Sequence, residues 1–173
     1  GAQYPWESAD DGSEQCPDWT IEPDGSCYRC YVAVYEHHVT AAVAYGIYDY
    51  VKITGDIDFL YTKGAEILTE TARFWASRCE YNNEQDRYEI NQVTGPDEWH
   101  EPVNNNLYTN YLARWNLKYV LSLLEVMKKE ETSSYNELVE KTGLTEMETA
   151  KWKEVQEKIY LPRKEGTKLL EQF

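Results

Sequence analysis

The sequence has no apolar run near the roughly 18 residues that a membrane-spanning helix requires, so we expect no transmembrane segment. It is also poor in positive charge: 17 Lys and Arg stand against 31 Asp and Glu, a formal net charge of −14. An anionic chain repels nucleic acid and anionic lipid, which excludes both as expected partners. The first residues, GAQYPWESADDG, lack the basic and apolar regions of a secretory signal. We therefore expect a cytoplasmic protein.

Cysteine is scarce, and its spacing is loose. The four cysteines are Cys16, Cys27, Cys30 and Cys79, and only Cys27 and Cys30 form a close C-x-x-C pair. Three of these thiols and an imidazole of His37 or His38 downstream would suffice for a zinc site. A disulfide and free thiols are the alternatives. Because no secretory signal points to an oxidising compartment, we expect free thiols and no metal.

Aromatic residues, by contrast, are abundant. The chain has 15 Tyr and 6 Trp but only 3 Phe, and 42% of its 173 residues are apolar, enough for the core of one domain. Tyr and Trp join an apolar body to a polar group, which suits amphipathic ligands such as sugars. A Tyr-rich helical core explains most of them equally well.

Apolar periodicity predicts helices over residues 36–54, 63–79 and 107–129. Asp56 is expected to cap a short turn before the second of these, and Ser134 a helix that stops at Gly143. Thr145 and Glu148 form a capping box for the helix EMETAKWKEVQEKIY, which we expect Pro162 to end. The sequence thus predicts an all-α domain, such as a ring of helical hairpins.

Between these helices the sequence predicts mostly irregular structure. Residues 1–30 are rich in Asp, Gly, Ser and Pro and are expected to form a loop, and residues 81–86 a polar turn. RYEINQV alternates like one short strand of a hairpin, and TGPDEWHEPVNNN is interrupted by Gly95, Pro96 and Pro102. Functional sites commonly lie in loops on a rigid scaffold.

The most unusual loop is residues 91–111, where Asp97 and Glu98 precede Trp99 and His100. Adjacent side chains of an extended segment point to opposite sides, so one carboxylate can face a substrate while the other anchors the loop through backbone N–H groups. A carboxyl group desolvated by Trp99 would have a raised pKa, as the general acid of glycoside cleavage needs. We therefore interpret Glu98 as a candidate acid.

Plainer roles are open for the same residues. Asp97 is equally expected as a turn residue after Pro96, and His100 as a structural hydrogen-bonding group. Asn104, Asn105 and Asn106 offer donors and acceptors for sugar hydroxyls, or they form a loop in which Asn106 is the N-cap of the next helix.

Two further segments fit sugar binding. YPWES places Trp6 beside Glu7, and an indole face next to a carboxylate is a common sugar platform; an apolar anchor with an incidental Glu is the alternative. Glu36, His37 and His38 stand at a helix start, where adjacent histidines diverge. Hydroxyl recognition or loop anchoring is therefore favoured there over a metal site.

Several segments together resemble glycoside hydrolase family 65, which contains maltose, trehalose, kojibiose and nigerose phosphorylases and some hydrolases. They are GAQYPWESADDG, EHHVTAAVAYGIYDYVKITGDIDFL, GAEILTETARFWASRCEY, YEINQVTGPDEWHEPVNNNLYTNYLARWNL and the terminal LEQF. The resemblance covers nearly the whole chain in the same order. It implies a catalytic domain built as an (α/α)6 barrel.

The resemblance also implies an activity: inverting phosphorolysis of an α-glucosidic disaccharide to β-glucose 1-phosphate. Glu98, in GPDEWHE, matches the general acid, and Trp6 and Glu7 match residues around the non-reducing glucose. His38 and Asn106 lie in matching segments, and we group them, with Asp97, as substrate-binding. Inorganic phosphate would be the co-substrate, with no other cofactor. A hydrolase of the same family and a non-catalytic carbohydrate-binding protein remain the alternatives.

This sequence departs from the family pattern in three ways. Members are several times longer, so residues 1–173 are expected to be a fragment of the barrel without the N-terminal β-sandwich and the later barrel, which carries the phosphate site or a hydrolytic base. Ala42 stands where many relatives have Asp, and the segment from Cys16 to Cys30 lies where acceptor specificity is set. Expected partners are therefore the disaccharide, phosphate, the remainder of the parent chain and, by analogy, a second copy in a homodimer.

Overall fold

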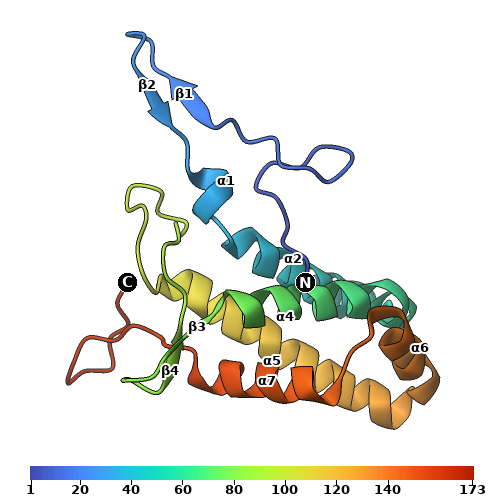
Figure 1. The fold of residues 1–173 in the computed structure, drawn as a ribbon. Helices are drawn as coiled ribbons and strands as arrows, with labels where there is room; N and C mark the ends of the chain where they lie inside the picture. The colour runs from blue at the N-terminus through green and yellow to red at the C-terminus, as the bar shows by residue number, and fades with distance from the viewer.

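The structure is a computed structural model that describes all residues, 1–173. Figure 1 shows a body of packed helices from which an N-terminal β-hairpin projects. The elements in chain order are β1 (Trp19–Ile21), β2 (Cys27–Arg29), α1 (Val32–Tyr35), α2 (His38–Thr54), α3 (Ile57–Phe59), η1 (Leu60–Gly64, one turn of π-helix), α4 (Ala65–Arg78), β3 (Glu80–Asn82), β4 (Arg87–Glu89), α5 (Leu107–Glu130), α6 (Thr132–Thr142) and α7 (Glu146–Lys158).

The long helix α5 is the centre of the body and packs against α2, α4, α6 and α7. Its buried residues recur at helical spacing, and they meet the side chains of the neighbouring helices. The largest fully buried apolar side chains are Trp75, Trp152, Leu68, Ile90, Leu117 and Met127. This core holds α2, α4 and α5 together, and the candidate site is built at the ends of these helices.

Local capping sets several of the helix boundaries. Asp56 accepts a hydrogen bond from the amide of Phe59 at 2.9 Å, and Thr145 and Glu148 form the predicted capping box of α7. Gly143 ends α6 in the left-handed conformation, at φ 63°. The predicted cap at Ser134 is wrong, because α6 already begins at Thr132.

The prediction of loop for residues 1–30 is wrong in its second half. β1 and β2 pair antiparallel there, joined by a turn in which Gly25 has φ 85° and Asp24 accepts a hydrogen bond from the amide of Ser26 at 2.9 Å. A second hairpin pairs β3 with β4, so the polar turn is shorter than predicted. β4 lies in RYEINQV, so the predicted hairpin strand is confirmed there, whereas β1 and β2 are too short to show alternation in the sequence.

The all-α prediction is confirmed in its coarse form: helices dominate, with two small hairpins. The closed ring of an (α/α)6 barrel is not shown by these residues (Figure 1). One side of α2 and α5 carries uncovered aromatic side chains: Tyr45 is 43% exposed, Tyr108 46% and Tyr111 56%. None of the helices combines the length and apolar character needed to cross a bilayer.

Candidate active site

The loop that carries Glu98 is closed at its base by a pair of backbone hydrogen bonds. The amide of Val93 donates to the carbonyl of Val103 at 2.9 Å, and the amide of Val103 donates back at 2.8 Å. The amide of Thr94 then donates to the carbonyl of Tyr35 at 3.0 Å, which fixes the loop beside the start of α2. Residues 94–102, here called the acid loop, therefore have a defined position over the helical body.

The three consecutive asparagines hold the acid loop from its C-terminal side. Asn104 and Asn105 accept hydrogen bonds of 3.0 and 3.1 Å from backbone amides within residues 90–92. Asn106 is 3% exposed and caps α5 by accepting from the amide of Thr109 at 3.1 Å. The structural interpretation of the run, including the N-cap, is confirmed. A sugar-binding role for Asn106 stays a prediction, and its side-chain oxygen is already engaged.

Asp97 is the anchor of the acid loop. Its carboxylate accepts hydrogen bonds from Nδ1 of His100 at 2.8 Å, from Nε2 of Gln172 at 2.8 Å and from the amide of Trp99 at 3.2 Å. The bond from Gln172, and next the bond from His100, lower the pKa of Asp97. An ionised Asp97 thus fixes the neighbour of Glu98, as expected for one member of an adjacent carboxylate pair.

The expectation that Trp99 desolvates Glu98 is wrong in this structure. The Trp99 side chain is 94% exposed, and Glu98 is exposed as well. Both lie at the rim of a hollow of about 470 Å³ between the acid loop and the β1–β2 hairpin, lined by Thr20, Tyr28, Cys30, Tyr31, Val32, Glu98, Trp99 and Glu101. Glu98 is therefore accessible to a ligand in the hollow, and Tyr28 and Tyr31 belong to the same lining.

Trp6 and His38 lie side by side. Their ring centroids are 5.6 Å apart at an angle of 67°, and the His38 ring also meets Tyr108 edge-on at 5.5 Å. Trp6 remains 36% exposed, so part of the indole is open to a ligand. Burial lowers the pKa of His38, against opposing contributions from Thr94 and Glu98, so the imidazole is favoured in its neutral form.

Glu14 fixes the YPWES segment, a role that the sequence did not reveal. Its carboxylate accepts hydrogen bonds from the amides of Trp6 at 2.6 Å and Glu7 at 3.0 Å, and from the amides of Gln15 and Cys16. Glu7 itself is exposed, with its side chain free for a ligand. Glu14 sits in an acidic, turn-rich stretch, so nothing in its local sequence distinguishes it from a solvated residue.

The sequence placed Glu36 with His37 and His38 at a helix start but did not reveal its burial. It is 2% exposed, and burial, then interaction with Glu98, raises its pKa to about 8. Of the two roles left open for this segment, the contacts of His37 fit loop anchoring: Arg78 donates to its Nδ1 at 3.2 Å, and its Nε2 lies 2.9 Å from the carbonyl of Val34. His37 and His38 diverge, as expected for neighbours at a helix start.

The cysteines and histidines considered for zinc do not meet. No group of three or more His, Cys, Asp and Glu side chains is placed to hold a metal ion. All four cysteines are free, and the sulfurs of Cys16 and Cys30 lie 3.9 Å apart beside the hollow. Of the three alternatives, the geometry leaves two: free thiols, or a disulfide between Cys16 and Cys30.

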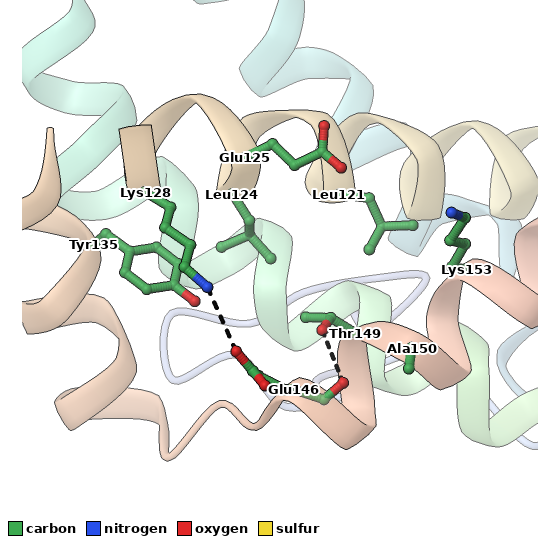
Figure 2. A pocket seen from close by; sticks show the side chains of 9 residues that line it. All are labelled: Leu121, Leu124, Glu125, Lys128, Tyr135, Glu146, Thr149, Ala150 and Lys153. Carbon is green, nitrogen blue, oxygen red and sulfur yellow. Dashed lines mark hydrogen bonds and ion pairs between the residues drawn. The ribbon is translucent and has the colours of Figure 1, made fainter. Parts of the chain in front are cut away.

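Figure 2 shows a second hollow, of about 280 Å³, between α5, α6 and α7. Its walls are the side chains of Leu121 and Leu124 and the stems of charged residues, with an ion pair between Lys128 and Glu146 at 3.4 Å (Figure 2). It is formed by other elements than the acid loop and contains none of the candidate residues. The hollow beside Glu98 is therefore the better candidate site.

The fold and the site together define a helical domain with a carboxyl-bearing loop fixed over one end. An indole and a neutral imidazole lie beside this loop, at the start of the adjoining helix. The model of the glycosyl hydrolase family 65 central catalytic domain matches residues 1–173. The chain belongs to this family.

Named relatives agree with the family match. Over 173 residues, all of this chain and 22% of the relative, the chain is 53% identical to a kojibiose phosphorylase of Caldanaerobacter subterraneus subsp. tengcongensis. It is 39% identical to an α,α-trehalose phosphorylase of Thermoanaerobacter brockii over 163 residues, 94% of this chain and 20% of the relative. A solved structure named "Putative kojibiose phosphorylase from human microbiome" superposes with a TM-score of 0.82 at 29% identity, covering 99% of this chain and 21% of that one. The chain thus spans about a fifth of the length of these relatives.

Proposed function

We propose that residues 1–173 carry the general acid of an inverting phosphorylase that acts on an α-glucosidic disaccharide. The observation that carries this proposal is the position of Glu98, exposed on an anchored loop at the rim of a hollow, in a chain that matches the family model over its full length. Relatives named as kojibiose, trehalose and nigerose phosphorylases support the reaction type. The linkage and the acceptor sugar are left open.

In the proposed reaction, Glu98 protonates the glycosidic oxygen as its bond to the anomeric carbon breaks. Inorganic phosphate attacks that carbon from the opposite face, and β-glucose 1-phosphate and the acceptor sugar are formed. Trp6 would pack against the glucose ring, while Glu7 and His38 would bind its hydroxyls. Asp97 holds the loop that carries the acid, and phosphate needs no protein base because it is already anionic.

The proposal includes the architecture of the whole catalytic domain. The exposed aromatic side of α2 and α5, with Tyr45, Tyr108 and Tyr111, is where we place further helices of an (α/α)6 barrel. Large uncovered aromatic surfaces are unfavourable in water, so packing helices against them would stabilise the domain. Phosphate-binding residues would lie outside residues 1–173.

The test is release of glucose 1-phosphate from a panel of α-linked disaccharides by the polypeptide of full family length that contains this segment. Phosphate-dependent release of the β-anomer is the expected result, and the disaccharide that reacts gives the linkage. Free glucose formed without phosphate would show that the activity is that of a hydrolase of the same family and not of a phosphorylase. Saturable sugar binding with no turnover, whether or not phosphate is present, would indicate a carbohydrate-binding protein without catalytic activity.

A further inference from the structure

The last residue of α4, Arg78, joins the start of α2 to the segment that leads into the acid loop. Its Nε donates to Nδ1 of His37 at 3.2 Å. Its Nη2 donates to the carbonyl of Asn91 and lies 3.5 Å from the carbonyl of Gln92. The entry to the acid loop and the entry to α2, which begins with His38, therefore meet at one guanidinium group.

The contact between Arg78 and His37 fixes the position of the ring proton. A guanidinium group can only donate, so Nδ1 of His37 accepts and the proton is on Nε2. Nε2 donates in turn to the carbonyl of Val34 at 2.9 Å. Burial, and next the charge of Arg78, lowers the pKa of His37 to about 4, so the ring is neutral near pH 7. One directed chain of hydrogen bonds thus connects Asn91, Arg78, His37 and Val34.

The backbone is unusual at the point where it meets Arg78. Gln92 has φ 53°, in the left-handed region that a residue with a side chain rarely adopts. Its amide donates to Oδ1 of Asn104 at 3.0 Å, while its own carbonyl and that of Asn91 face the guanidinium group. Such conformations persist where the surrounding groups fix them. Arg78 and Asn104 are those groups here, directly before the acid loop.

The two segments that Arg78 joins carry different parts of the candidate site. The acid loop carries Glu98, and α2 carries His38, whose ring lies 5.6 Å from that of Trp6. An acid can protonate the glycosidic oxygen only when it lies within hydrogen-bond reach of that atom in the bound sugar. A displacement of about 1 Å can lower the rate by roughly 100-fold. The spacing between acid and sugar is therefore sensitive to the contacts that hold these two segments together.

We propose that Arg78, together with His37, is a positioning residue for the candidate acid: it sets the distance between the acid loop and the sugar bound beside His38. This inference rests on the proposed function and adds to it a residue that touches neither sugar nor phosphate. The planar fork of arginine reaches an imidazole and a backbone carbonyl at once in fixed directions, whereas lysine has the same charge without the fork. Glu80, 3.2 Å from Nη1, is 59% exposed, so this ion pair contributes little.

The test is Arg78→Lys in the polypeptide of full family length. We expect kcat to fall by about tenfold or more and the KM for the disaccharide to stay within about threefold, because the sugar-binding groups are retained. His37→Ala should lower kcat in the same way, whereas His37→Gln, which keeps an acceptor for Arg78, should retain most of it. In the double variant of Arg78→Lys with His37→Ala the losses should not add, because both substitutions break one chain of hydrogen bonds.

Arg73→Lys is the matched control. Arg73 lies on the same helix, and its side chain is 17% exposed against 19% for Arg78, but it pairs with Glu70 and Glu148. We expect this variant to lower the unfolding midpoint and to leave kcat within about twofold. Equal losses of kcat in the two arginine variants would overturn the proposal, because general destabilisation would explain both. An unchanged kcat in Arg78→Lys, or additive losses in the double variant, would overturn it as well.

Two measurements without substrate separate this inference from the proposed function. Nitrogen-15 NMR should show an unprotonated Nδ1 in His37 whose shift changes in Arg78→Lys. Hydrogen exchange at the amide of Thr94, which donates to the carbonyl of Tyr35 at 3.0 Å, should be faster in Arg78→Lys and unchanged in Arg73→Lys. If exchange follows this pattern but the unchanged enzyme releases no glucose 1-phosphate, the proposed function fails and Arg78 still fixes the acid loop. If glucose 1-phosphate is released and exchange at Thr94 is the same in all variants, the positioning role fails alone.

Discussion

Gln172 donates a hydrogen bond of 2.8 Å to the carboxylate of Asp97 across 75 residues of sequence, and this contact ties the acid loop to the end of the described chain. Asp97 also accepts from His100, so the residue before the candidate acid is held from two directions. The geometry indicates that Asp97 positions the loop that carries Glu98. The effect of Asp97 on catalysis can be measured separately from any contact it makes with sugar.

For Asp97→Asn, we expect kcat to fall by about 10- to 100-fold with little change in KM, because small displacements of a catalytic group cost roughly that much. Gln172→Ala removes one contact only and should have a smaller effect in the same direction. Steady-state kinetics of both variants measures this. A rise in KM with unchanged kcat would instead identify Asp97 as a substrate-binding residue.

For Glu98→Gln, kcat is expected to fall by about 100-fold or more while disaccharide binding is retained, because the amide keeps the shape but cannot donate the proton. Isothermal titration with the disaccharide and rate measurements on the same preparation give both quantities. The control is Glu130→Gln at the end of α5, which should leave both unchanged. Full turnover in Glu98→Gln would remove this residue from the acid role.

His37 makes stability depend on pH in a defined direction. Burial, followed by the charge of Arg78, lowers its pKa from 6.5 to about 4. Between these values the unfolded chain binds a proton that the folded chain excludes, so the free energy of unfolding decreases as the pH falls from 6.5 to 4. His37→Gln keeps an acceptor and a donor for Arg78 and Val34 without titrating, and should flatten this dependence.

Denaturant unfolding at pH 7, 5.5 and 4.5 measures the difference between the two proteins. Glu36 acts in the opposite sense, because its raised pKa makes the folded state bind the proton between 4.5 and about 8, and stability from this group falls as the pH rises. Comparing the variant with the unchanged chain cancels that contribution. Parallel curves for the two proteins would contradict the assignment to His37.

Cys16 and Cys30 are expected to form a disulfide when a disulfide reagent such as oxidised glutathione is supplied. Their sulfurs are 3.9 Å apart, and side-chain rotation is enough to approach the bond length of about 2.0 Å. Two thiols are oxidised to one disulfide, and one glutathione disulfide is reduced to two glutathiones. Burial, then the contact with Cys30, raises the pKa of Cys16 to about 11, so the reaction should accelerate as the pH rises toward 9.

Thiol titration and peptide mass mapping measure this reaction. Cys30→Ser should keep Cys16 reduced, whereas Cys27→Ser should leave the cross-link unaffected, since Cys27 is exposed and outside the pair. Formation of a Cys27–Cys30 bridge in place of the predicted one would show that the hairpin rearranges.

The helices were predictable because their determinants are local. The helical periodicity of α5, the cap at Asn106 and the capping box of Thr145 and Glu148 each depend on residues within four positions of one another. Glu98 was identified as a candidate because its loop combines costly residue types at a density that a connecting segment does not need. The hairpin at RYEINQV was predicted from its alternation, whereas the β1–β2 hairpin was missed because its strands of three residues leave almost no pattern in the sequence.

The sequence by itself determined the helical class, most helix ends, the family and the candidate acid, because each of these is encoded in residue type and short-range spacing. Only the tertiary structure decided which side chains lose contact with water. Trp99, expected to desolvate the acid, is exposed, while Glu36 is buried next to Tyr35, whose carbonyl accepts a hydrogen bond from the amide of Thr94 in the acid loop. Burial depends on segments that meet from distant parts of the chain, and the pKa of a carboxyl group follows that burial.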